Sequence, residues 1–183
     1  MVLAAGRGSR FGGDTHKLLA PLRGRTVLDH ALDAAREARL DEVILVLGAL
    51  GPEQLDLPDD VTVVVNEAWE EGQAGSLRVG VAVARAHGHD AVVVGLGDQP
   101  FVGAEAWRRV AAARSHPIVV ADYGGGRRQP PVRLDASVWD LLPAGGDEGA
   151  RALMRVRPEL VAAVACPGEP ADVDTPEDLR PWS

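Results

Sequence analysis

Short apolar runs alternate with amphipathic segments along this chain, and this alternation constrains the fold more than any other feature. Four runs are continuous and rich in β-branched residues: Val43–Leu47, Val61–Val65, Ala91–Leu96 and Ile118–Ala121. Continuous rather than alternating apolar runs are what a parallel sheet requires when helices cover both of its faces. The pattern therefore predicts four buried strands.

Segments with helical periodicity lie between and after these runs. In Thr26–Ala38 the apolar residues keep the helical period, and Thr26 followed by Asp29 indicates a capping box at the N-terminus. Three further helices are predicted over Ala74–His87, Ala104–Ala113 and Asp147–Arg155. The alternation of strands and helices predicts an α/β fold with a doubly wound, mostly parallel, Rossmann-like sheet. The length fits one domain spanning residues 1–183.

Composition excludes several classes of function. The formal net charge of −8 argues against nucleic acid as a partner, because no basic surface would offset the phosphates. The apolar runs are far shorter than the roughly 18 residues of a membrane span, so no membrane partner is expected. The single cysteine, Cys166, excludes an internal disulfide framework. We expect a cytoplasmic protein, since the opening residues lead directly into a glycine-rich segment rather than a signal peptide.

This glycine-rich segment runs from Gly6 to Gly13, directly after Val2-Leu3-Ala4-Ala5. Glycines let backbone N–H groups converge on an anion, because no Cβ atom blocks the approach. Arg10 and Lys17 can add positive charge, and lysine is so scarce in this chain that Lys17 stands out. We interpret the segment as a loop that binds phosphate groups, although an ordinary Gly/Arg turn fits it as well.

Two familiar glycine motifs do not match this loop. A dinucleotide-binding G-x-G-x-x-G would place glycine where the sequence has Phe11. A P-loop would end in G-K-[ST], which Gly12-Gly13-Asp14 does not match. If the loop binds phosphate, it belongs to another class.

Acidic residues follow one predicted strand and recur near the end of the chain. Asp98, in Gly97-Asp98-Gln99-Pro100, would lie just beyond the carboxyl end of Ala91–Leu96, where open α/β sheets bind ligands. Such a carboxylate can bind Mg²⁺ together with phosphate oxygens, although a simple turn fits it equally well. Asp172 and Asp174 alternate on an extended segment, so only one of them can face a common site. Thr175 and Pro176 then begin a capped terminal helix.

Together these segments resemble the nucleotidyltransferases with a GT-A-like Rossmann core, most closely the molybdenum cofactor cytidylyltransferases and their guanylyltransferase relatives. The resemblance is carried by Leu3–Gly13 with Lys17, Gly75–Gly80 (GSLRVG), Gly97–Pro100 (GDQP), Gly146–Arg151 (GDEGAR) and Val173–Asp178 (VDTPED). The D-Q-P and G-D-x-G-A-R motifs are more specific than the glycine loop, which many sugar-nucleotide enzymes share.

The resemblance implies a Mg²⁺-dependent enzyme that transfers CMP from CTP to a phosphorylated molybdopterin cofactor and releases pyrophosphate. It implies a nucleotide site formed by Leu3, Ala4, Ala5, Gly6, Gly8, Ser9, Arg10, Gly12, Lys17, Gly75, Ser76 and Asp98. Within this set Arg10, Lys17 and Asp98 would be catalytic, and Asp98 with Asp174 would hold Mg²⁺. The implied partners are a nucleoside triphosphate, a phosphorylated pterin and, during cofactor delivery, a molybdoenzyme.

The resemblance also bears on the nucleobase and the acceptor. Ala4-Ala5-Gly6 resembles the loops of the pyrimidine enzymes, and the methyl group of Ala5 leaves less room for a purine, which favours CTP. The pterin cytidylyltransferases carry G-H-P where this chain has Arg128-Gln129-Pro130-Pro131, a departure that concerns the acceptor. The alternatives are a guanylyltransferase acting on molybdenum cofactor or a small phospho-acid, and a non-catalytic cofactor-insertion protein with the same fold.

Three other features have two interpretations each. His16 is expected to be exposed to solvent rather than close to a phosphate. Trp69 is expected to pack or to cap the surface, with a lid over the site as the alternative. The segment Gly124–Pro131 is predicted to be a mobile loop or a hairpin, in which Arg127 and Arg128 form either a solvated tip or a clamp for the acceptor's phosphate.

Overall fold

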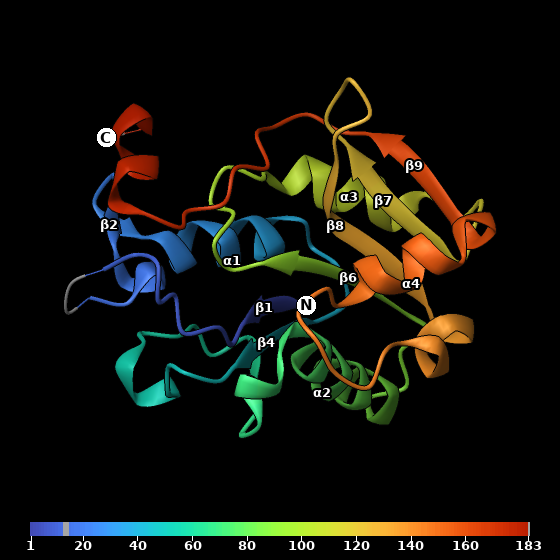
Figure 1. Ribbon diagram of the computed structural model, residues 1–183, viewed down its shortest axis with the longest axis horizontal. Helices are drawn as coiled ribbons and strands as arrows, with labels where there is room; N and C mark the ends of the chain where they lie inside the picture. Colours follow the sequence, from blue (N-terminus) through green and yellow to red (C-terminus); the bar gives the residue numbers. More distant parts are fainter. Residues whose placement is uncertain (13–14, 183) are drawn as a thin grey trace.

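The computed structural model describes residues 1–12 and 15–182, which form one α/β domain around a seven-stranded, mostly parallel sheet (Figure 1). Gly13, Asp14 and Ser183 lie outside the described residues. The strand order is β5-β4-β1-β6-β8-β7-β9. The strands are β1 (Val2–Ala4), β4 (Val43–Leu47), β5 (Val61–Val65), β6 (Ala91–Leu96), β7 (Ile118–Asp122), β8 (Arg128–Asp135) and β9 (Val161–Ala165). The expected fold class is therefore confirmed.

The four predicted strands are present as β4, β5, β6 and β7, and the last of these extends one residue further than predicted, to Asp122. They were predicted to be buried, but β5 is an edge strand and is only partly buried, because no strand among the described residues pairs with its outer side. Strand β8 was not predicted and runs antiparallel to both β6 and β7. It begins inside the segment predicted as a loop or hairpin, and the hairpin is what forms: Tyr123 N–H donates to the carbonyl of Arg127 across the turn. The pairing of β7 with β8 shifts register between Val120 and Ala121, close to the two prolines of β8, and prolines are tolerated at such irregularities.

The helices are α1 (Val27–Glu37), α2 (Gln73–Ala86), α3 (Ala104–Ala112) and α4 (Ala150–Val156). At the start of α1 the predicted capping box is present, with Thr26 Oγ1 accepting from Asp29 N–H and Asp29 Oδ2 accepting from Thr26 N–H. The predicted start of the last helix at Asp147 was wrong. Gly149 has φ 52° and ψ −130°, a conformation that no α-helix contains, so α4 begins only at Ala150.

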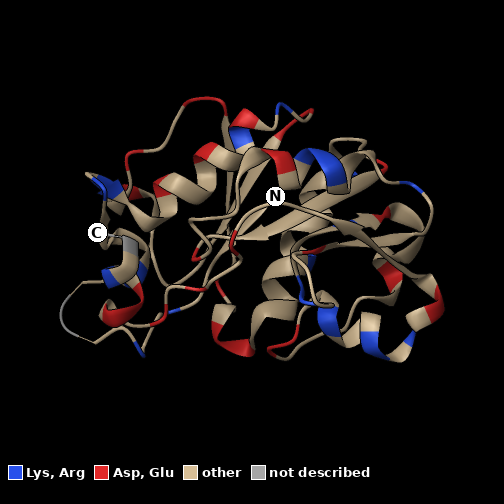
Figure 2. Cartoon of the chain, turned by 90° about the horizontal axis from the view of Figure 1, so that it is seen from above, with Lys and Arg blue, Asp and Glu red and all other residues tan. Residues whose placement is uncertain are grey.

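Helices cover both faces of the sheet, as the view from above in Figure 2 shows. Alternate residues of β1 face opposite layers: Val2 and Ala4 join the apolar cluster containing residues of α1 and α3, whereas Leu3 joins the cluster containing residues of α2 and α4. The small hairpin β2 (Pro21–Leu22) and β3 (Arg25–Thr26) was not predicted. Short 3₁₀ helices complete the fold: η1 (Lys17–Leu19), η2 (Pro52–Gln54), η3 (Trp69–Glu71), η4 (Ala136–Leu141), η5 (Pro158–Leu160) and η6 (Pro176–Trp182). Among the described residues, none of the helices has the length and apolar character needed to cross a membrane.

Candidate active site

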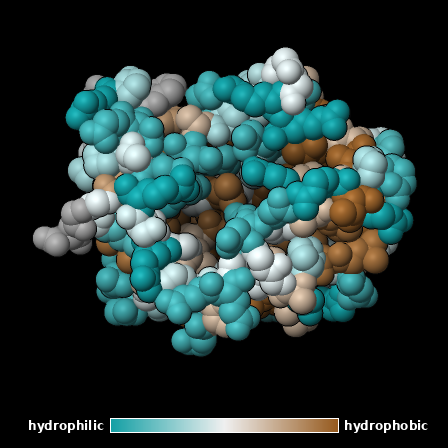
Figure 3. Space-filling view, viewed as in Figure 1, coloured by the Kyte–Doolittle hydropathy of each residue, from teal (hydrophilic) through white to brown (hydrophobic). Residues whose placement is uncertain are grey.

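A cleft of about 480 Å³ opens where β1 and β6 end, a volume typical of small-molecule sites. From β1 the chain crosses to β4 on one side, and β6 pairs with the other side of β1, so the cleft lies at the topological switch point of the sheet. Figure 3 shows a hollow near the middle of this face with apolar residues at its bottom and mostly hydrophilic residues around it. The cleft is therefore placed where an open α/β sheet binds its ligand.

Most of the residues predicted to bind the nucleotide line this cleft: Leu3, Ala4, Ala5, Gly6, Gly8, Ser9, Arg10, Lys17, Ser76 and Asp98. Asp174, predicted to hold Mg²⁺, lines it as well. Gly12 and Gly75 are not among the lining residues, although Gly75 is the direct neighbour of Ser76, which does line the cleft. The fold thus brings together side chains from both ends of the sequence and from its middle.

The charged centre of the cleft is built around Lys17. Its Nζ lies 2.5 Å from Asp98 Oδ2 and 3.1 Å from Asp174 Oδ1, and Arg10 Nη2 lies 3.1 Å from Asp174 Oδ2. The Lys17 side chain is only 11% exposed. Burial by itself lowers the pKa of Lys17, but the charges and hydrogen bonds of Asp98 and Asp174 outweigh it, so the net effect raises the pKa and keeps the ammonium group charged.

Asp98 and Asp174 are brought together by a tether between the end of β6 and the segment before η6. The N–H of Val173 donates to the carbonyl of Asp98 at 2.8 Å. The buried Gln99 donates through Nε2 to the carbonyl of Pro170 at 3.2 Å and to Asp172 Oδ1 at 2.8 Å. Asp174 therefore faces Lys17, whereas its neighbour Asp172 faces Gln99. Burial, with the charge of Asp98 added, raises the pKa of Asp172.

The glycine loop is held by His16, which sequence reasoning expected to be exposed. That expectation was wrong, because the side chain is half-buried and both ring nitrogens have partners. Nδ1 accepts from Leu18 N–H at 3.2 Å, so Nε2 carries the proton and donates to the carbonyl of Gly6 at 2.9 Å. Burial lowers the pKa of His16, against the effect of its bond to Gly6. The neutral form of the His16 imidazole is thus the one that makes both hydrogen bonds.

Gly8 shows why this loop needs a glycine next to Lys17. Its φ is +66°, and a Cβ atom at this position would lie 2.7 Å from Lys17 Cγ. Any other residue would be strained in its backbone and would displace the lysine stem. The glycine at this position therefore leaves room for the side chain of Lys17 and keeps the backbone accessible to a ligand.

The opposite wall of the cleft comes from η3 and the first turn of α2, and sequence reasoning identified little of it. Trp69, Glu70, Gly72 and Gln73 line the cleft together with the predicted Ser76. The Ser76 hydroxyl is buried and accepts from Asn66 Nδ2 at 3.0 Å, which fixes its position. The sequence signals for this wall were the Gly75–Gly80 motif, which indicated Ser76, and the position of Trp-Glu-Glu-Gly just before it.

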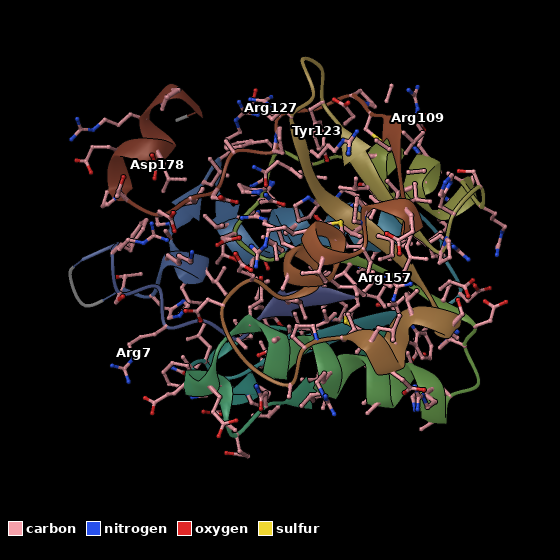
Figure 4. The ribbon with its side chains drawn as sticks, turned by 45° about the vertical axis from the view of Figure 1, so that its right-hand side comes forward. Arg7, Arg109, Tyr123, Arg127, Arg157 and Asp178 are labelled. Carbon is pink, nitrogen blue, oxygen red and sulfur yellow. The ribbon has the colours of Figure 1, made fainter. Side chains whose placement is uncertain are left out.

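Arg7 connects the glycine loop with this wall, at the edge of the structure where Figure 4 labels it. Its guanidinium carbon lies 5.1 Å from the centroid of the Trp69 ring, and its Nη2 lies 2.8 Å from Glu70 Oε1. These groups are largely exposed, so the contacts contribute little to stability. Trp69 therefore borders the cleft, rather than only capping the surface away from it.

A smaller, more apolar pocket adjoins the cleft and shares Leu3, Gln73 and Leu96 with it. Arg128 and Arg151 are among its lining residues. The neighbouring Arg127 instead pairs with Glu169 at 3.0 Å. Of the two arginines at the hairpin, Arg128 thus lines this pocket, whereas Arg127 forms an ion pair with Glu169.

A cleft of this kind, with a glycine loop, a buried lysine and two carboxylates at the switch point of an α/β sheet, is the arrangement of an enzyme that acts on a phosphorylated ligand. Residues 1–164 match the family model of the MobA-like NTP transferase domain. The chain belongs to this family and is a nucleotidyltransferase.

Curated proteins and solved structures are similar to nearly the whole chain. The chain is 33% identical over 193 residues to nicotine blue oxidoreductase of Paenarthrobacter nicotinovorans, covering 98% of this chain and 93% of that protein. It superposes with a TM-score of 0.82 on a nucleotidyl transferase from Methanothermobacter thermautotroptrophicus, at 28% identity and covering 99% and 94% of the two chains. It superposes with a TM-score of 0.80 on Rv0371c of Mycobacterium tuberculosis, solved in complex with manganese, at 36% identity and covering 99% and 95%.

Proposed function

We propose that this nucleotidyltransferase uses CTP and transfers CMP to a phosphate group of a molybdopterin-type cofactor, with release of pyrophosphate. The observation that carries the proposal is the convergence of Lys17, Asp98 and Asp174 in the cleft, beside the glycine loop. A cationic side chain and two carboxylates at one point are suited to a triphosphate accompanied by a divalent cation.

In the proposed reaction, a phosphate oxygen of the acceptor attacks the α-phosphorus of the nucleotide. The bond from that phosphorus to the oxygen bridging to the β-phosphate breaks, and pyrophosphate leaves with the electron pair. The backbone of the glycine loop and the cations Arg10 and Lys17 bind the triphosphate and stabilise the charge that develops on it. This step requires no nucleophilic side chain.

Asp98 and Asp174 fit the role of ligands to Mg²⁺. Both reach the same Lys17 Nζ, so a single small cation can reach both carboxylates, and carboxylate oxygens are ligands that Mg²⁺ and Mn²⁺ prefer. When bound, the divalent cation would neutralise phosphate oxygens of the nucleotide. The manganese complex of Rv0371c supports a divalent cation in this family.

Ala5 supports the choice of CTP. This residue lines the cleft, is nearly buried, and its carbonyl accepts from Ala49 N–H at 3.0 Å. The methyl group is thus held in place and takes space that a purine would need. The preference for a pyrimidine rests on this methyl group and on the resemblance of the loop.

The adjoining pocket is a suitable place for the acceptor. Its apolar walls can contact a flat ring system, and Arg128 and Arg151 can pair with a phosphate. The chain lacks the G-H-P stretch of the pterin enzymes, so Arg128 would recognise the acceptor in its place. Delivery of the product to a molybdoenzyme, and a cytoplasmic location, complete the proposal.

Pyrophosphate release tests the proposal. The purified protein is incubated with Mg²⁺, molybdopterin-type cofactor and each of CTP, GTP, ATP and UTP, with Asp98→Asn as the inactive control. Release with CTP that depends on both the acceptor and Mg²⁺ is expected. A preference for GTP would favour the guanylyltransferase alternative, and no release with any pair would overturn the proposal. Oxidation of NADH and NADPH is followed in parallel, because one relative is named an oxidoreductase.

A further inference from the structure

A second group of potential metal ligands lies at the end of the sheet opposite to the cleft, where the parallel strand β4 begins. Glu42 immediately precedes β4, whereas the cleft lies beyond the carboxyl ends of the strands. His87 and His89 follow the last residue of α2. One ligand atom from each of the three side chains lies within 4.8 Å of the other two. None of these residues has a role in the proposed transfer reaction.

The spacing of these atoms is close to that of a metal site. Glu42 Oε1 lies 3.0 Å from His87 Nδ1, and Glu42 Oε2 lies 2.6 Å from His89 Nε2. Ligand atoms about 2.0–2.1 Å from a tetrahedral zinc ion are separated by about 3.3 Å. Lengthening these two contacts by less than about 1 Å would give the carboxylate–imidazole spacing of a zinc site, and the three ligand atoms all lie within 4.8 Å of one another.

The three side chains are held in place by their surroundings. Thr62 on β5 donates to Glu42 Oε1 at 2.5 Å, the kind of secondary hydrogen bond that orients carboxylate ligands in metal sites. The backbone N–H of His87 donates to the carbonyl of Val83, and that of His89 donates to the carbonyl of Ala84. The backbone of both histidines is thus held at the C-terminal end of α2, where the helix dipole favours a cation.

The cluster also has space beside it. Glu42 and His89 line a cavity of about 140 Å³, whose other charged lining residues are Asp41, Asp90, Arg114 and Arg133. This volume accommodates an ion with one or two water ligands. The three side chains are between 20% and 45% exposed, so an ion can enter from solvent without unfolding.

We propose that Glu42, His87 and His89 bind a divalent transition-metal ion of the zinc class, with water in the remaining position. The ion would connect the end of α2 to the start of β4, and its role would be structural. The site is separate from the cleft and does not depend on the proposed transfer reaction.

Metal titration of the chelator-treated protein tests this site. Zn²⁺ is added in competition with a chromophoric chelator, and Co²⁺ is added to observe the intense visible absorption of a tetrahedral complex. We expect one equivalent to bind with a dissociation constant of about 1 μM or tighter, and at least tenfold weaker binding in each of His87→Ala and His89→Ala. His116→Ala is the matched control, because His116 is exposed and lies outside the cluster.

The variant Asp98→Asn/Asp174→Asn separates this site from the cleft, and thermal melting shows that each variant is folded. If this double variant and His116→Ala each still bind one equivalent of Zn²⁺, the proposal is supported. Loss of binding in the double variant, unchanged affinity in His87→Ala, or no saturable binding would overturn it. His87 is the more exposed of the two histidines, so its variant preserves the test if His89→Ala does not fold.

Discussion

The ammonium group of Lys17 lies 2.5 Å from the carboxylate of Asp98, although 81 positions separate the two residues in the sequence. The same ammonium group contacts Asp174, so one cation is shared by two carboxylates. Phosphate groups and a divalent cation would compete for these same partners. Lys17 can therefore exchange carboxylates for phosphate as the nucleotide and the cation bind.

Replacing Lys17 with methionine should separate these two roles. We expect kcat to fall about 10²- to 10³-fold, because a charge aimed at the reacting phosphates is lost. We also expect Mn²⁺ to bind the nucleotide-free protein about tenfold more tightly, since Asp98 and Asp174 lose their competing cation. Calorimetric titration and pyrophosphate release measure the two effects. Lys17→Arg keeps the charge and is the control; weaker Mn²⁺ binding in the methionine variant would contradict this account.

Gly6→Ala should affect nucleotide binding without affecting the fold. A Cβ atom at Gly6 would meet nothing within 4 Å and φ is not positive, so the variant should unfold at the same urea concentration as the native protein. In the cleft the added methyl would obstruct a phosphate close to the backbone, and we expect KM for the nucleotide to rise about tenfold. Gly103→Ala is equally unhindered but lies outside the cleft, so its KM should not change. An unchanged KM in Gly6→Ala would remove this glycine from the nucleotide site.

Gln99 is expected to act as a positioning residue for Asp174. In Gln99→Leu the hydrogen bonds to Pro170 and Asp172 are lost, which should lower the free energy of unfolding by about 1–3 kcal/mol. The tether to Asp174 would loosen, so kcat should fall and the Mg²⁺ concentration for half-maximal rate should rise, with little change in KM for the nucleotide. Asp172→Asn is the control, because its amide oxygen still accepts from Gln99. An equal Mg²⁺ requirement in Gln99→Leu and the native protein would show that the role is only structural.

The sequence predicted those strands whose local run of apolar, β-branched residues already indicates a strand in a parallel sheet. Strands β4, β5 and β6 are continuous apolar runs rich in β-branched residues, and their bounds were predicted without error, although β5 lies at the edge of the sheet and is only partly buried. Strand β8 contains two prolines and two arginines, and only its contact with β6 and β7 makes it a strand. Its local sequence favours a loop, so local periodicity could not find it.

The same distinction applies to the site. Asp98 was indicated by its position after a strand, but its proximity to Asp174 depends on the tether through Gln99, which no local pattern reveals. His16 looked like an exposed residue because its partner, the carbonyl of Gly6, is a backbone group. The wall formed by Trp69 and Glu70 depends on how η3 packs against the glycine loop, and no motif reports that.

Ala5→Gly should change the choice of nucleobase. Removing the methyl group would enlarge the cleft where we place the base, so the ratio of kcat/KM for CTP to that for GTP should fall about tenfold. Parallel assays with the two nucleotides measure the ratio. Ala49→Gly is the control, because Ala49 meets Ala5 only through its backbone N–H and does not line the cleft. A ratio that does not change in Ala5→Gly would show that this methyl group does not select the base.

Tyr123 should resist ionisation in alkaline solution. It is the chain's single tyrosine, so tyrosinate absorbance reports on this residue alone. Its hydroxyl donates to the carbonyl of Pro130 at 2.8 Å, and it lies close to Arg127 in Figure 4.

Burial, with Cys166 added and Arg127 opposing, raises the pKa of Tyr123 well above its ordinary value of 10.0. Because the folded-state pKa exceeds the unfolded-state pKa, this tyrosine stabilises the fold fully below pH 10.0, and its contribution is lost as the pH rises toward the folded-state pKa. Lys17, whose pKa is also raised, titrates in alkaline solution as well. Comparing urea unfolding of the native protein with that of Tyr123→Phe at a series of pH values isolates the contribution of Tyr123, because Lys17 is present in both proteins. The difference in unfolding free energy between the two proteins should shrink above pH 10.0, and a folded protein whose tyrosine titrates at its ordinary pKa would contradict the argument.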